Sequence, residues 1–246
     1  MSALTIGGIV FVFLSLAISM GMMLSLRLPH HHLGADSKDT IKLATAVVGT
    51  LSALALGFLI ASAKTTFDVA EAELRTSVAQ VVLLDRVMAH YGAETAGARQ
   101  ALAQLVEARL QQSGQGGGEI ATAGIEPVQD ELRSLIPEVE VKRLLQSRAL
   151  EVSGKIAEAH WLLVEQEGEE PPWAFLAILV FWLALLFFTF GLLSPRNATV
   201  VSILLVCALS VAGAVFLIID MAHPYLGFIR VSDAPLRMAL ENLGRT

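Results

Sequence analysis

Hydrophobic positions along the chain gather in four uninterrupted runs separated by polar stretches. None of the four contains Asp, Glu, Lys, Arg or His. Each is about 20 residues long, the length that a helix needs to cross roughly 30 Å of hydrocarbon. A soluble helix of that length would carry a polar face. The pattern therefore predicts four membrane-spanning helices, at 4–26, 43–63, 173–193 and 198–219.

The first run is interpreted as a retained span rather than a secretory signal. No basic residue precedes it, and no small-x-small cleavage pattern follows before Arg27. Four spans place both termini on one side of the membrane, together with the segment 64–172 and the tail 221–246. Basic residues near the span ends barely distinguish the two orientations. We expect the cytoplasm on that side, since nothing in the sequence explains the translocation of a folded acidic segment.

The segment 64–172 has the pattern of an all-α stalk. From residue 65 to 91 no Gly or Pro interrupts the second span's helix, and apolar residues recur every seven positions, which favours packing along another helix. A second helix is predicted over 94–112, then a flexible loop at 113–118 and a long returning helix over 138–167. A short helix is expected in the tail. The heptad positions are Phe67, Leu74, Val81 and Met88, with Ala70, Ser77, Leu84 and Tyr91.

Composition and charge narrow the possible functions. Hydrophobic residues make up 54% of the chain and charged residues 16%, which fits neither a disordered chain nor a soluble enzyme. The net charge of −6 combines −8 in segment 64–172, which has 18 acidic against 10 basic residues, with +2 in the rest of the chain. No basic stripe with interleaved aromatics occurs, so no nucleic-acid partner is expected. The single cysteine, Cys207, rules out a disulfide within the chain.

Candidate chemistry is sparse. No cluster of titratable residues suggests an enzyme, and no cofactor or metal is expected. The tract His30–His32 is interpreted as a solvated loop, because adjacent histidines point in different directions. Asp85 and Arg86 are either a buried ion pair or a surface pair. Asp220 closes the fourth span, where it reaches the headgroup layer, pairs with a base such as Arg230, or belongs to an ion site.

The second span carries the clearest functional pattern, because it is rich in small and hydroxylated residues. One edge forms a seam of small residues that lets helices approach closely. A second edge is basic and polar at its mouth and apolar in its middle, as in pores that gate by dewetting. Alternatively, small residues only pack the four helices tightly. The predicted packing seam comprises Ala46, Thr50, Ala53, Gly57 and Ala61. The predicted pore wall comprises Lys42, Thr45, Gly49, Ser52, Leu56, Ile60, Ala63, Lys64 and Phe67.

Several stretches resemble one bacterial family of four-span proteins, formerly a domain of unknown function and now labelled bestrophin-like. The first stretch is 41–68, which begins Ile-Lys-Leu-Ala-Thr and ends Lys-Thr-Thr-Phe-Asp. The others are Leu84-Asp85-Arg86, residues 181–199 with Phe-Gly-Leu-Leu-Ser-Pro-Arg-Asn-Ala-Thr, and residues 224–240. The resemblance covers nearly the whole chain and is loosest over 113–130.

The resemblance implies a pentameric ion channel in the bacterial inner membrane, whose second spans line the pore and whose helical cytosolic parts extend it. Two features depart from bestrophins: the chain lacks the acidic C-terminal cluster that binds calcium in eukaryotic channels, and it lacks their aromatic-rich pore neck. From the resemblance as a whole we expect a homo-oligomeric channel for small inorganic ions. The alternative is a membrane-anchored signalling or scaffold protein whose stalk binds a partner.

Overall fold

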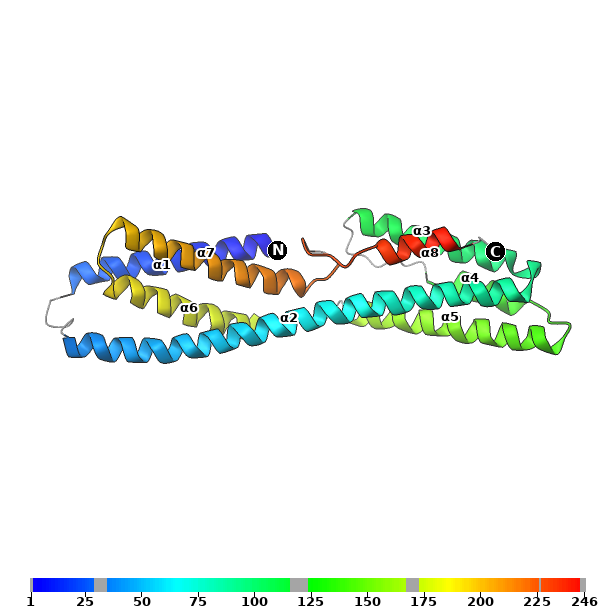
Figure 1. Cartoon of the computed structure of the whole chain (residues 1–246), viewed down its shortest axis with the longest axis horizontal. Coiled ribbons are helices and arrows are strands. Elements are labelled where there is room, and N and C mark those ends of the chain that lie inside the picture. The colour runs from blue at the N-terminus through cyan, green and yellow to red at the C-terminus, as the bar shows by residue number, and fades with distance from the viewer. Residues whose placement is uncertain (1, 29–34, 116–123, 167–172, 226, 244–246) are drawn as a thin grey trace. The chain divides into compact units, whose positions relative to one another are not determined.

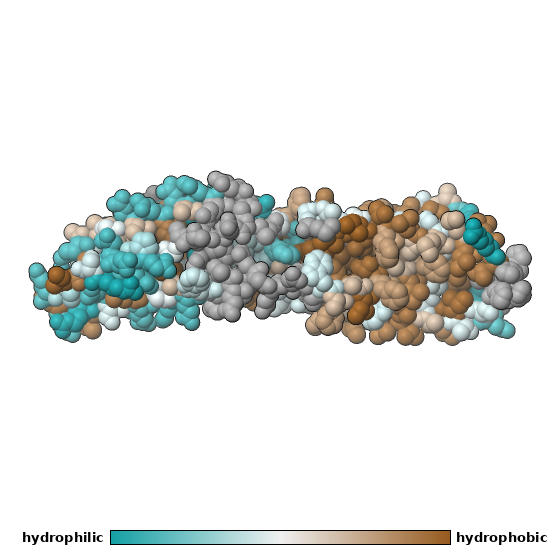
Figure 2. Space-filling view, turned by 180° about the vertical axis from the view of Figure 1, so that it is seen from behind, coloured by the Kyte–Doolittle hydropathy of each residue, from teal (hydrophilic) through white to brown (hydrophobic). Residues whose placement is uncertain are grey.

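The computed structural model describes residues 2–28, 35–115, 124–166, 173–225 and 227–243 (Figure 1). Within these ranges every regular element is a helix. The chain divides into two compact units. Unit 1 comprises Met1–Thr66 and Pro171–His223, and unit 2 comprises Phe67–Glu170 and Pro224–Thr246. On the face seen in Figure 2, apolar side chains dominate unit 1 and hydrophilic ones dominate the described part of unit 2.

Unit 1 holds the four apolar runs. They lie in α1 (Ala3–Arg27), the first part of α2 (Ala35–Tyr91), α6 (Trp173–Leu193) and α7 (Ala198–Met221). All four helices are long and apolar enough to cross a membrane. The predictions of four long apolar helices and of an all-helical fold are therefore confirmed for the described residues. Buried apolar side chains from all four form one core.

Two glycines bring α1 and α6 into close contact. A Cβ built on Gly21 would overlap the carbonyl oxygen of Phe188 and approach the Leu192 nitrogen to 2.8 Å. On the facing helix, a Cβ on Gly191 would overlap the carbonyl oxygen of Ile18. Each glycine thus lies against the backbone of the other helix, the close approach that small residues allow between membrane helices.

The short turn between α6 and α7 is fixed by two polar contacts. Asn197 caps α7, because its side-chain oxygen accepts a hydrogen bond from the Val200 N–H at 3.1 Å. Arg196 donates from Nη2 to the Ser25 hydroxyl at 2.8 Å. This turn is therefore tied to the end of α1, and the structure gives Arg196 an anchoring role.

Helix α2 is continuous over 57 residues, which corresponds to about 85 Å of helix. Its first part belongs to unit 1 and its second part, from Phe67, to unit 2. No glycine or proline lies between Gly57 and its end at Tyr91. Gly92 then ends the helix with a φ of 127°, a left-handed conformation that glycine adopts without steric cost.

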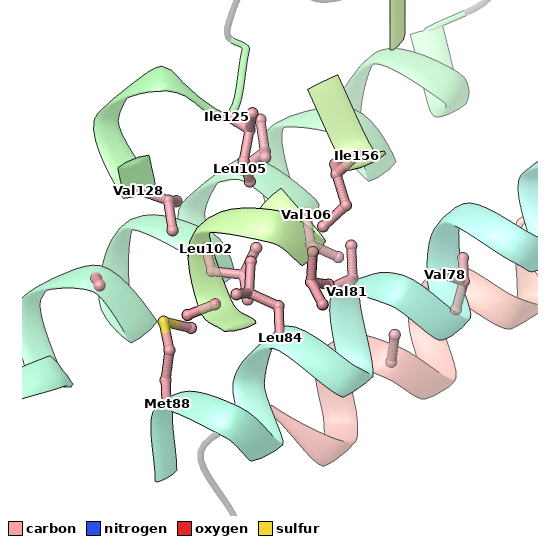
Figure 3. Packing of buried hydrophobic residues seen from close by; sticks show 14 of the residues in the cluster. Val78, Val81, Leu84, Met88, Leu102, Leu105, Val106, Ile125, Val128 and Ile156 are labelled. Atoms are coloured by element: carbon pink, nitrogen blue, oxygen red, sulfur yellow. The ribbon is translucent and has the colours of Figure 1, made fainter. Parts of the chain in front are cut away.

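Unit 2 is a helical bundle around the second part of α2. It adds the 3-10 turn η2 (Ala93–Thr95), α3 (Ala96–Gln115), α4 (Glu126–Ser134), α5 (Glu140–Gln166) and α8 (Ala234–Asn242). Figure 3 shows labelled side chains from α2, α3, α4 and α5 pointing into one shared interior. The heptad positions on α2 are buried or half-buried, as the sequence predicts. The buried ones include Ser77, Val81, Leu84, Met88 and Tyr91.

The ends of the helices differ slightly from the expectations. Helix α3 continues through 113–115, three residues into the predicted loop, and 116–118 lie outside the described residues. Helix α5 begins at Glu140 rather than 138. The short helix expected in the tail is α8, which follows Asp233 and carries Pro235 in its first turn.

The turn between α2 and α3 is held by side chains of three elements. The Thr95 hydroxyl lies 2.7 Å from the Met88 carbonyl oxygen and donates to that end of α2. The Lys142 ammonium pairs with Glu94 and lies 5.2 Å from the centre of the Tyr91 ring. The hydrogen bond from Lys142 lowers the pKa of Glu94, and the same bond raises the pKa of Lys142.

Candidate functional site

The candidate site is the surface that α2 presents within unit 1. Three faces of the helix differ in residue type and in cover. One face packs into the bundle through buried Ser52, Leu59 and Ala63. A second face carries large exposed apolar side chains, as expected for a surface in contact with lipid tails. It comprises Leu43, Val47, Leu51, Leu54 and Phe58.

The third face of α2 consists of small residues and is open. All five residues of the predicted packing seam are exposed within the chain. Gly57 has nothing within 4 Å of a Cβ built on it. The face is therefore uncovered by the chain's own helices. It is open to a second helix or to water, and we name it the small open face: Ala46, Thr50, Ala53, Gly57 and Ala61.

The predicted pore wall falls on two different surroundings. Lys42, Ile60 and Lys64 are exposed, whereas Ser52 is only 2% exposed and Ala63 is buried as well. A Cβ on Gly49 would meet Leu186 of α6 at 3.7 Å. The remaining positions are half-buried: Thr45, Gly49, Leu56 and Phe67. Pore lining belongs to an assembly of chains and stays a prediction, but in the single chain this edge faces largely into the bundle.

Hydroxyl groups on α2 are satisfied by the helix itself. Thr50 donates to the Ala46 carbonyl at 3.0 Å, and Ser52 donates to the Val48 carbonyl at 2.8 Å. Thr45 does the same with Ile41 at 2.7 Å. Such back-bonding removes the cost of burying a hydroxyl donor in an apolar surrounding and leaves its oxygen as an acceptor.

Lysines flank the small open face at both ends. Lys42 is exposed and lies 3.1 Å from Asp39 one turn earlier, so its charge is partly compensated on the same helix. Lys64 is exposed at the far end of the apolar run. The helix thus presents small side chains between two basic positions.

A buried ion pair joins α2 to α3 in unit 2. Asp85 is almost fully buried and accepts two hydrogen bonds from Arg99, from Nε at 2.7 Å and from Nη2 at 3.2 Å. This hydrogen bond raises the pKa of Arg99. The sequence suggests Arg86 as the partner of Asp85, but Arg86 is exposed. The pair is structural, because it fixes the register of α2 against α3.

Two other candidates from the sequence have different outcomes. Asp220 is buried near the end of α7, so its side chain packs inside the chain and is not exposed at the surface. The tract His30–His32 lies outside the described residues.

Comparison with known families gives one match. The family described as the bestrophin-like domain matches residues 12–236, which is nearly the whole chain. Neither curated proteins nor solved structures give a match.

Proposed function

The chain belongs to the bestrophin-like family, and from this premise we propose that it is a homo-oligomeric ion channel in which copies of α2 surround a shared aqueous axis. The permeant species would be small inorganic ions. By family analogy the assembly is a pentamer in the bacterial inner membrane, with the termini and unit 2 in the cytoplasm.

One observation supports the proposal above the others: α2 is the least covered of the four spans. Only 11% of its most apolar stretch is buried in the chain, against 22% for that of α1, 33% for that of α6 and 28% for that of α7. A helix that served only to complete a four-helix bundle would be covered like the others. A helix surface that contacts lipid tails normally carries large apolar side chains. Within the uncovered surface of α2, the small open face lacks them.

The exposed positions refine which residues would face the axis. A side chain buried against its own bundle, such as Ser52 or Ala63, cannot face water shared between copies. The proposed wall therefore keeps the exposed members of the predicted wall and takes in members of the small open face. At spacings of three, four and seven residues it comprises Lys42, Ala46, Ala53, Gly57, Ile60 and Lys64. Ile60 is its only large apolar residue and is the proposed dewetting constriction.

The second part of α2 supports association between copies. A helix surface in water is normally rich in charge, yet one exposed stripe here is uncharged and repeats at heptad spacing. A neighbouring copy of the chain would cover it. The stripe comprises Val69, Ala72, Thr76, Ala79 and Leu83.

The proposal is tested by ion flux from liposomes that contain the purified protein. Flux above empty liposomes is expected. Ala53→Trp places an indole on the proposed wall and should abolish the flux. Leu54→Trp, one residue along on the lipid-facing side, should leave it unchanged. Absence of flux from a protein that elutes as a folded oligomer, or equal effects of the two variants, would count against the channel.

A second function is favoured by a separate observation in unit 2. Four large apolar side chains are exposed in the turn before α5 and in its first turns, among them Ile136 at 87%. Such a patch on a polar surface is typical of protein-binding sites. The alternative is therefore a membrane-anchored scaffold that binds a partner there: Ile136, Val139, Val141 and Leu144. Loss of partner binding on Val141→Asp, in a protein without flux, would favour it.

A further inference from the structure

The segment that joins α7 to α8 is a closed loop. The Val231 N–H donates to the Pro224 carbonyl at 3.0 Å, which joins the two ends of the loop. Inside it, Arg230 donates from Nε to the Gly227 carbonyl at 2.8 Å. Val231 itself is buried. The base of the loop is therefore defined by the hydrogen bond between Val231 and Pro224, and both of these residues belong to unit 2.

Apolar side chains project from this loop. Phe228 is 80% exposed, Ile229 is 41% exposed, and Tyr225 is exposed as well. Single exposed apolar residues are common on soluble proteins. Here Phe228 and Ile229 are adjacent, and they lie between Gly227 and Arg230, which are joined by the side-chain hydrogen bond, so the loop displays them together.

The segment carries positive charge and no negative charge. Between Met221 and Ser232 there is no Asp or Glu, while Arg230 supplies a positive charge and is exposed. The next acidic residue is Asp233 at the start of α8. Phospholipid headgroups carry negative phosphates, and aromatic and basic side chains gather at that layer.

Chain connectivity keeps the loop near the end of a span. Helix α7 has 24 residues and is about 36 Å long, more than the roughly 30 Å of hydrocarbon, so its end reaches the headgroup region. Pro224 follows Met221 by three residues. Phe228 lies four residues from Pro224, so its Cα is at most about 14 Å from the base of the loop.

We propose that residues 227–231 of this loop form a membrane-insertion element. Phe228 and Ile229 enter the boundary between headgroups and acyl chains, and Arg230 lies at the level of the phosphates. The occupant of this apolar surface is the lipid bilayer, because the covalent link to α7 holds the loop beside it. The loop therefore gives unit 2 a direct contact with the membrane, in addition to the three points where the chain joins it to unit 1.

Site-directed spin labelling tests this element in the full-length protein. The background is Cys207→Ala, which removes the native thiol, and a nitroxide is attached at Phe228→Cys in liposomes of zwitterionic and anionic phospholipid. Two control sites give the values expected in lipid and in water. Leu209→Cys on the exposed surface of α7 is the lipid reference, and Ser147→Cys on the exposed surface of α5 is the water reference. Collision with oxygen reports lipid, and collision with a water-soluble nickel chelate reports water.

The expected result at position 228 is an oxygen-to-nickel ratio several-fold above that at Ser147→Cys and close to that at Leu209→Cys. Ile229→Cys should behave in the same way, which guards against a local effect of one substitution. A ratio at 228 equal to that at Ser147→Cys would place the loop in water and overturn the proposal. Low collision with both reagents would show that protein covers it, a second copy included, and would overturn it equally. Neither outcome depends on whether the protein conducts ions.

Discussion

Enlarging Gly21 by one methyl group should force α1 and α6 apart. In the structure a Cβ at this position would overlap the Phe188 carbonyl oxygen and approach the Leu192 nitrogen to 2.8 Å. Both are backbone atoms, so no side chain can rotate out of the way. The helices must separate by about an ångström, and a gap of that size forfeits a quarter to a half of each van der Waals contact it opens.

The cost follows from two opposing contributions. Overpacking of this kind destabilises by about 1–3 kcal/mol, whereas replacing a helical glycine by alanine recovers about 0.5–1 kcal/mol of backbone entropy. Gly21→Ala should therefore lose about 1–2 kcal/mol of unfolding free energy. Gly8→Ala is the matched control on the same helix, because nothing lies within 4 Å of its added Cβ. It should be neutral or gain about 0.5 kcal/mol.

Chemical denaturation of the protein in micelles, followed by circular dichroism, measures the difference. Gly191→Ala lies at the same crossing, against the carbonyl oxygen of Ile18. The double variant with Gly21→Ala should cost less than the sum of the single variants, since the helices have already separated. Equal stabilities for Gly21→Ala and Gly8→Ala would refute the close crossing.

Two further predictions concern unit 2. Asp85→Ala should lower the free energy of unfolding by about 2–3 kcal/mol in the same assay, because it leaves the largely buried Arg99 without the Asp85 carboxylate. The double variant Asp85→Leu with Arg99→Met should recover most of this loss. Equal losses in the single and double variants would contradict a buried pair. Because Lys142 lowers the pKa of Glu94, the carboxylate stabilises the fold above its ordinary pKa of 4.5 and loses this effect as pH falls through the lowered value. The stability advantage of wild type over Glu94→Gln should therefore be constant near neutral pH and vanish in acid, and a constant difference down to pH of about 2 would refute the pairing.

The sequence predicts the helices well because helices in lipid and helices in water have different residue patterns. A helix in lipid needs a long uncharged run, whereas a helix in water shows an apolar seam on an otherwise polar surface, such as the heptad seam that ends at Tyr91. The faces of α2 in unit 1 were harder to predict. In lipid both packed and open surfaces are apolar, so composition does not show that Ser52 turns inward and Gly57 outward. The partner of Asp85 was missed because Arg99 reaches it only through the register of two antiparallel helices.

The central claim is that the small open face of α2 borders water shared between copies of the chain. In a Cys207→Ala background, single cysteines at Ala46, Ala53 and Gly57 are compared with cysteines at Val47 and Leu54 for reaction with a membrane-impermeant thiol reagent in liposomes. The account predicts fast modification at the first three, with loss of ion flux, and protection at the other two. Protection at all five positions, or equal modification on both faces, would contradict it.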